Sequence, residues 1–422
     1  MTLTVDRVRA GVQRRLRRPF ALLAVLGPGL IAANAGNDAG GIATYASAGA
    51  EFAYRMLFIM VLVTVALVVV QEMAARLGAT TGNGLVSLIR EQFSLRLATF
   101  CVVCLMVANL GLVVSEFAGI GAAMELLHVS RYLAVPLAAL GVWAVVVFGS
   151  YRYAERVFIL ISLVFLAYPI AAVLGHPDWG EVASNTLWPH LVASNEFLFL
   201  TVALIGTTIT PYMQLYQAAA VVERGATPDD LRAIRIDSVS GSIFACLISM
   251  SIIVATAAAI GGTGPLTSAA DAATALEPVA GNAASTLFAI GLLGASLLAA
   301  AVVPLATSYA LAEAIGVERS VSRRFRDAKL FLGLFTAQII VGTGIALLPG
   351  NLIDLLLNTQ FLNGLITPIL LTFIVVLANR RRLMGPNANT PSFNVLATIC
   401  TVAVAVLAAV VTVQAFVSWT TG

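Results

Sequence analysis

A cluster of polar residues interrupts an apolar stretch near the start of the chain. Residues 34–44 read NAGNDAGGIAT, inside a hydrophobic run from Phe20 to Ala48. A carboxylate, two amides and three glycines are poor residues for the middle of a hydrophobic helix, because glycine weakens helices and buried charge is costly. Since acids inside a membrane are usually functional, Asp38 is a candidate cation ligand. It could also cap a helix that starts after it, and the two roles are compatible.

A second interruption occurs further along the chain, where residues 203–214 read ALIGTTITPYMQ. Pro211 has no N–H to donate and its ring clashes with the preceding turn, so we expect the helix to break just before it. Within a bilayer, non-helical backbone survives only inside protein or along a watery cavity. The sequence therefore predicts two broken helices, whose freed carbonyls and helix ends face an ion near the middle of the membrane.

The composition indicates that these runs lie in lipid. Hydrophobic residues make up 59% of the chain and charged residues 11%, whereas water-soluble domains carry roughly 25% charged residues. A membrane-spanning helix needs about 20 mainly apolar residues. Eleven such segments are predicted, at 21–47, 55–77, 96–124, 132–149, 154–174, 197–222, 235–261, 284–313, 328–348, 351–380 and 392–417.

The placement of basic residues predicts the topology. All Lys and Arg residues except Arg55 and Arg131 fall in the N-terminal tail, in alternate connections between spans, or at the span ends that border those connections. The positive-inside rule then places the N-terminus in the cytoplasm and the C-terminus outside, with an odd number of spans. We predict a multi-pass protein of the plasma membrane with a basic cytoplasmic tail at 1–20. The alternative is a cleaved secretory signal, which would remove the first broken helix.

Other chemistries find little support in the sequence. Cys101 and Cys104 form a CxxC, but they lie in an apolar helical run and are interpreted as core packing. The three histidines lack metal-ligand spacing, and no nucleic-acid-binding pattern is present. No nucleophile–base pair is apparent, so we expect neither an enzyme nor a resident cofactor.

Five blocks of sequence resemble the Nramp family of divalent-metal transporters. Residues 27–50 resemble the first helix of the family, 71–85 the end of the second helix, and 108–126 the third helix. Residues 204–216 resemble the sixth helix, and 358–385 the tenth helix with its basic loop. This resemblance covers nearly the whole chain.

The resemblance implies an all-α integral membrane fold. It predicts eleven transmembrane helices in a LeuT-like 5+5 inverted repeat, with helices 1 and 6 broken. Residues 21–422 then form a single membrane domain. In that domain the first repeat covers about 21–174, the second about 197–380, and an extra helix about 392–417.

The resemblance also implies a metal site with substituted ligands. In the family, an Asp and an Asn on helix 1 and a Met on helix 6 bind a transition metal, assisted by backbone carbonyls. Here the Asn position falls on Gly41, and the Met-Pro-His of helix 6 becomes Thr210-Pro211-Tyr212. The helix-10 amide is retained. The implied metal site comprises Asp38, Thr210, Ala35, Thr207, Gln360 and Gly41.

These substitutions favour a hard cation. A thioether suits soft metals, whereas Mg²⁺ takes oxygen ligands at about 2.1 Å and keeps several waters. We therefore expect Mg²⁺ first and Mn²⁺ second, as substrates rather than cofactors, and the pattern resembles the Nramp-related magnesium transporter branch. Residues that could contact a hydrated ion, or could simply pack, are Asn34, Asn37, Thr208, Gln214 and Tyr212.

Most members of the family's proton path are missing. In proton-coupled members helix 3 carries two acids three residues apart; the second matches Glu116 and the first falls on Val113. The basic partners expected on helix 9 are absent from FLGLFTAQII, residues 331–340. We therefore expect uptake driven by the membrane potential without proton coupling. Glu116 is either a remnant of the proton path or a structural acid.

Three other functions remain open at this stage. The chain could be a proton-coupled transporter of Mn²⁺ or other transition metals, or an amino-acid or amine transporter in which Asp38 pairs with an ammonium group. It could also be a receptor that binds a cation without transporting it. In each case we expect a monomer in a lipid bilayer, with no nucleic-acid partner.

Overall fold

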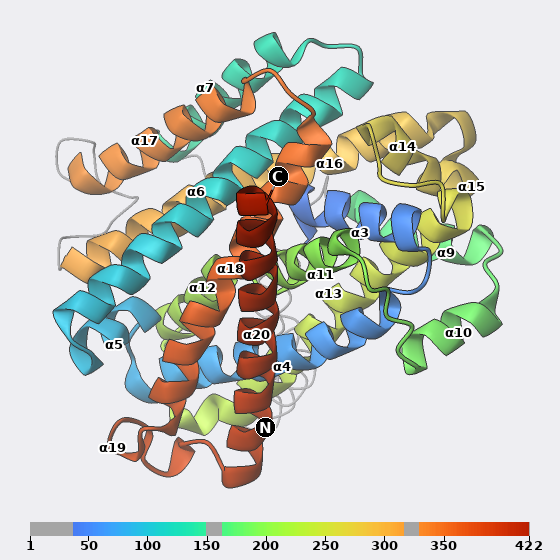
Figure 1. The fold of residues 1–422 in the computed structure, drawn as a ribbon. Helices are drawn as coiled ribbons and strands as arrows, with labels where there is room; N and C mark the ends of the chain where they lie inside the picture. Colours follow the sequence, from blue (N-terminus) through green and yellow to red (C-terminus); the bar gives the residue numbers. More distant parts are fainter. Residues whose placement is uncertain (1–36, 149–162, 316–328, 422) are drawn as a thin grey trace, which may run out of the picture.

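Long helices packed side by side make up most of the molecule (Figure 1). The computed structural model describes residues 37–148, 163–315 and 329–421, and within these ranges the regular elements are all helical. The longer helices are α3 (Ala39–Phe52), α4 (Leu57–Thr81), α6 (Leu95–Leu126), α7 (Arg131–Val147), α11 (Asn195–Thr208), α12 (Pro211–Glu223), α13 (Leu231–Ile260), α16 (Ala284–Ile315), α17 (Lys329–Ala346), α18 (Leu352–Asn379) and α20 (Pro391–Thr421). The shorter ones are α5 (Leu85–Gln92), α9 (Ala167–Leu174), α10 (Trp179–Leu187), α14 (Ala269–Ala273), α15 (Glu277–Ala280) and α19 (Arg381–Met384).

Most predicted spans coincide with helices to within a few residues. In the described ranges, seven helices are long and apolar enough to cross a membrane, and two shorter apolar helices cover Arg131–Val147 and Leu330–Ala346. The predicted spans 21–47 and 154–174 lie partly outside the described residues, and α3 and α9 are the parts that the structure describes. The count of eleven spans and the inverted repeat stay predictions.

The two longest gaps between predicted spans contain short helices. The segment 175–196 includes α10, and the segment 262–283 includes α14 and α15. Side chains cap two of these helices, since Asp178 accepts the Gly180 N–H at 2.8 Å and Ser268 accepts the Asp271 N–H at 3.3 Å. Such short helices show almost no hydrophobic periodicity, so they could not be predicted from the sequence.

Two glycines allow α11 and α18 to cross with their backbones in contact. A Cβ atom added to Gly206 would overlap the Gln360 carbonyl oxygen, and one added to Gly364 would overlap the Val202 carbonyl oxygen. Small residues at such crossings let membrane helices approach closely, which maximises van der Waals contact. The crossing therefore holds the end of α11 against the middle of α18.

Helices α6 and α16 pack in antiparallel directions and support the start of α3. Asn109 of α6 donates to the Thr307 hydroxyl of α16 at 2.8 Å. Ten residues further along α6, a Cβ added to Gly119 would overlap both Ala39 of α3 and Ser296 of α16. This packing positions α6, and the acid that it carries, beside the first turn of α3.

An ion-pair cluster around the buried Glu72 joins α4 to α13. Glu72 accepts from Arg76 on its own helix at 3.0 Å and from Arg235 of α13 at 2.7 Å. Arg76 also donates to the Asn387 carbonyl and to the Asn389 side chain, both at 2.6 Å. Because Glu72 and Arg76 of α4 also have partners on α13 and at residues 387–389, the cluster connects α4, α13 and the segment that precedes α20.

Candidate metal site

Asp38 lies directly before α3, where the backbone is still extended. Its Oδ1 accepts the Gly41 N–H at 2.7 Å, and the residue is 2% exposed. This confirms the predicted helix cap. Among the described residues, its Oδ2 has no partner by geometric criteria and no ion pair includes Asp38. One carboxylate oxygen is therefore positioned to bind a cation.

Glu116 of α6 lies next to Asp38. The two carboxyl groups are close enough to share a proton, and the Ala39 N–H lies beside Glu116. Glu116 is fully buried, and within the described chain neither of its oxygens makes a hydrogen bond of good geometry. Adjacent buried carboxylates repel each other unless a proton or a cation compensates their charge. A divalent cation at this position would neutralise both.

The predicted break in the sixth span is confirmed. Helix α11 ends at Thr208 and α12 begins at Pro211, with Ile209 and Thr210 non-helical between them. Because Pro211 has no N–H, the Thr207 carbonyl loses its donor within the helix. It accepts instead from the Thr210 hydroxyl at 3.4 Å, which is a long hydrogen bond. The negative end of the α11 dipole, with a weakly bonded carbonyl, therefore faces the break.

Helix α18 lies against both the start of α3 and the break in the sixth span. A Cβ added to Gly40, in the first turn of α3, would overlap the side-chain nitrogen of Gln360, and the Gln360 carbonyl lies against Gly206 in α11. Two turns further along α18, the Thr367 hydroxyl donates to the Ile209 carbonyl at 3.3 Å. Neither amide atom of Gln360 has a hydrogen-bond partner among the described residues. Its side chain is therefore free to coordinate an ion, or to hydrogen-bond a water molecule, between α3 and α11.

The predicted water-binding residues have different environments. Asn37 accepts from Ser249 of α13 at 3.1 Å, and Thr208 shares a hydrogen bond of 2.9 Å with Tyr45 of α3. Gln214 is fully buried, and both of its amide atoms lack partners in the described chain. Of these three residues, Gln214 has the most unused capacity to hydrogen-bond water.

The remaining candidates are partly placed. Asn34 and Ala35 lie outside the described residues. Gly41 lies within α3 and contributes its N–H to Asp38. Tyr212 and Met213 both pack in the hydrophobic core, so the thioether nearest in sequence to the break is a core side chain.

The atoms that could coordinate a metal in the candidate site are mainly oxygens, and they belong to residues of different types. No group of three or more His, Cys, Asp or Glu side chains in the described ranges could hold a metal ion. The candidate ligands are instead one or two carboxylates together with hydroxyl, amide and backbone oxygens. This set suits a hard cation that retains part of its water shell.

Several polar residues near the candidate site were not predicted from the sequence. Asn363 and Thr367 follow Gln360 on one face of α18, at a helical spacing that could have revealed them. Ser115 lies against Gly40, and Ser249 reaches Asn37 from α13. Single serines in apolar runs give no comparable signal.

Comparison with known proteins gives a consistent result. The profile of the Nramp family, described as natural resistance-associated macrophage protein-like, matches residues 29–414. The chain is 32% identical over 297 residues to the divalent metal cation transporter MntH 1 of Pseudomonas aeruginosa, covering 66% of each chain. It is 30% identical over 390 residues to the divalent metal cation transporter MntH of Ralstonia nicotianae, covering 87% of this chain and 86% of that protein.

Solved structures share the fold. The manganese transporter of Eremococcus coleocola superposes with a TM-score of 0.76 at 20% identity, covering 92% of this chain and 85% of that chain. MHP1, a nucleobase-cation-symport-1 family transporter, superposes with a TM-score of 0.56 at 13% identity, covering 92% of each chain. At these identities the likeness establishes the all-helical transporter fold alone.

Proposed function

Because the chain belongs to the Nramp family, we propose that it carries divalent metal cations across the plasma membrane by alternating access. The proposal places the N-terminus in the cytoplasm, Mg²⁺ ahead of Mn²⁺ as substrate, and transport without obligatory proton coupling. Relatives named as divalent metal cation transporters support the general substrate class. The preference for Mg²⁺ would assign the chain to the magnesium-transporting branch that its sequence resembles.

The observation that carries the proposal is the environment of Asp38. This carboxylate is 2% exposed, and its Oδ2 is unpartnered among the described groups. A buried acid in a membrane segment is costly unless a functional charge compensates it. The adjacent carboxyl of Glu116 increases that cost, which a divalent cation would relieve.

The preference for Mg²⁺ rests on the ligands beside Asp38. Thr210 occupies the position where the family has a methionine, and its side chain offers oxygen in place of sulfur. Mg²⁺ dehydrates reluctantly and is usually bound through few protein oxygens and several waters. The unpartnered amides of Gln360 and Gln214 supply groups that would hydrogen-bond such waters.

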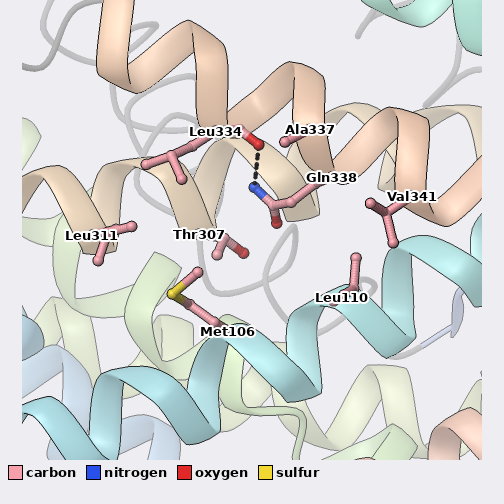
Figure 2. A pocket seen from close by; sticks show the side chains of 8 residues that line it. All are labelled: Met106, Leu110, Thr307, Leu311, Leu334, Ala337, Gln338 and Val341. Carbon is pink, nitrogen blue, oxygen red and sulfur yellow. Dashed lines mark hydrogen bonds between the residues drawn. The ribbon is translucent and has the colours of Figure 1, made fainter.

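The absence of proton coupling is supported by a pocket between α6, α16 and α17. Figure 2 shows the eight residues that line this pocket, and none has an ionisable side chain. The pocket has a volume of about 180 Å³ and includes Met106 of α6, Thr307 of α16 and Gln338 of α17. A proton relay needs groups that accept and release protons, and this lining supplies none. The membrane potential alone provides about 4.6 kcal/mol per 100 mV for a doubly charged ion, from about 2.3 per elementary charge.

A second candidate is proton-coupled transport of Mn²⁺. The contact between Asp38 and Glu116 favours it, because a shared proton displaced by an entering cation would couple the two ions. The names of the curated relatives and of the Eremococcus structure, a manganese transporter, favour Mn²⁺ as its substrate.

One experiment separates the two candidates. The purified protein is reconstituted in liposomes with a pH-sensitive dye inside, and uptake of Mg²⁺, Mn²⁺ and Ca²⁺ is followed under an imposed potential. We expect Mg²⁺ entry without internal acidification. Acidification in proportion to metal entry would establish the second candidate, and absence of any divalent-cation uptake would refute both.

A further inference from the structure

Gln71 of α4 is a buried amide that the site described above does not include. It is 1% exposed, and neither its oxygen nor its nitrogen has a hydrogen-bond partner among the described residues. Burying an amide without partners is unfavourable, and more so where lipid surrounds the protein. The amide of Gln71 therefore indicates that a polar species other than the protein, such as water or a hydrated ion, lies next to it.

Helix packing places Gln71 level with the break in the sixth span. Gly78 of α4 lies so close to the Ala218 carbonyl of α12 that a Cβ there would approach it to 2.6 Å. Glu72 of α4 pairs with Arg235 of α13 while Thr64 lies beside Cys246, so α4 and α13 are antiparallel. The contact of Gln217 with Ser238 across the short connection makes α12 and α13 antiparallel as well, so α4 and α12 run in the same direction. Gln71 lies seven residues before Gly78, on the same face of α4 and about 10.5 Å away along the helix axis. The equivalent residue seven positions before Ala218 is Pro211, the first residue of α12.

Contacts with α13 place Gln71 in the same region. Thr64, one heptad before Gln71 on α4, lies beside Cys246 of α13. The α4 face therefore meets α13 at one end and α12 at the other, with Gln71 between them. Gln217 of α12 donates a hydrogen bond of 3.0 Å to Ser238 of α13, so these two helices meet each other here.

We infer that Gln71 belongs to the ion path and, with Gln214, forms an uncharged wall that hydrogen-bonds the water shell of the cation as it passes the break towards α12. The inference rests on the proposed cation transport and adds a specificity-determining residue to it. Both amides are unpartnered and at most 1% exposed. Amide groups accept and donate hydrogen bonds without adding charge, so they hold hydrated ions without trapping them. An ion that keeps its water, such as Mg²⁺, depends on them most.

The test compares uptake of Mg²⁺ and Mn²⁺ in liposomes for the wild type and Gln71→Leu. We expect Mg²⁺ uptake to fall about 10-fold, as for groups that act through a metal's surroundings, with a clearly smaller loss for Mn²⁺. Gln71→Asn retains the amide and should keep part of the Mg²⁺ preference. A purely structural role would lower both rates equally and leave their ratio unchanged.

The matched control is Gln338→Leu, which removes an amide with an unpartnered Oε1 from the pocket between α6, α16 and α17. It should leave both rates unchanged. Should the Leu variant fail to insert, Gln71→Met keeps the unbranched shape without hydrogen-bonding groups and carries the same expectation. An unchanged Mg²⁺/Mn²⁺ ratio in a folded variant, with an active wild type, overturns this inference alone. A wild type that transports neither ion overturns the proposed function and this inference with it.

Discussion

Two regions beside α6 differ sharply in their chemistry. On one side, Glu116 faces Asp38 and the start of α3, among buried oxygens that lack protein partners. On the other side, Met106 and Leu110 line a pocket with α16 and α17 that contains no ionisable group. A single helix therefore borders both a site suited to a cation and a space unsuited to moving protons.

This difference separates two tasks that a coupled transporter must combine. Binding a cation needs fixed negative charge, which Asp38 supplies at the start of α3. Moving a proton away needs a chain of titratable groups, and the pocket that α6 shares with α16 and α17 is lined by none. If the two regions differ in this way, changes to Asp38 and to the candidate ligands beside it alter transport, and changes to the pocket alter only stability.

The largest effect is expected at Asp38. Asp38→Ala should reduce Mg²⁺ uptake by about 100-fold, the upper range for groups that control a metal site. It should also lower stability by about 1 kcal/mol through loss of the cap on α3. Asp38→Asn should lose uptake equally but keep the cap, since Asn caps helices as well as Asp. Liposome uptake and thermal melting measure the two effects. Full uptake by a folded Asn variant would contradict the site.

A smaller change in selectivity is expected at Thr210. The Thr210 hydroxyl does not cap α12. Thr210→Met can therefore introduce a thioether without removing a helix cap. The sulfur should shift the Mn²⁺/Mg²⁺ uptake ratio towards Mn²⁺ by about 10-fold, because thioethers favour softer metals. Thr372→Met places the same group on the exposed side of α18 as a control. Equal ratios in the two variants would show that residue 210 does not contact the ion.

The effect expected at Glu116 is smaller still. Glu116→Gln should change Mg²⁺ uptake by much less than the about 10-fold typical of a residue that supports a metal ligand. Because no relay follows it, dye-loaded liposomes should remain at constant internal pH with both proteins. Loss of an acidification signal present in the wild type would instead make Glu116 a proton carrier and end the contrast between the two regions.

The smallest effect is expected in the pocket. Thr307→Val keeps the side-chain shape and removes the hydrogen bond from Asn109. Hydrogen bonds between membrane helices contribute about 0.6 kcal/mol on average, so the melting temperature should fall slightly while uptake stays unchanged. Reduced uptake at wild-type stability would mean that the pocket takes part in transport.

The sequence predicted the break at Pro211 from the missing N–H, but a proline does not always produce one. Pro304 lies inside α16 and Pro368 inside α18, and both helices continue through them. At the break, hydroxyls from Thr210 and from Thr367 of α18 accommodate the freed carbonyls. The second of these is a tertiary contact, which local sequence does not encode.

Other features of the site depended on tertiary structure in the same way. Helix periodicity predicted most spans, since long apolar runs admit few alternatives. Helix crossings place Glu116 next to Asp38 and the side chain of Gln360 against Gly40. These crossings depend on close packing at glycines, which local sequence does not predict. The cap by Asp38 was predicted because it involves residues only three positions apart.

The Gly41 N–H donates to the carboxylate of Asp38, the proposed cation ligand, so this amide should respond when a cation binds there. An ion that draws Asp38 towards itself must strain or strengthen that bond, so the deuterium exchange rate of this one amide should change with bound metal. Following Gly41 by mass spectrometry, with Asp38→Asn as the metal-insensitive reference, would register binding without any flux across a membrane.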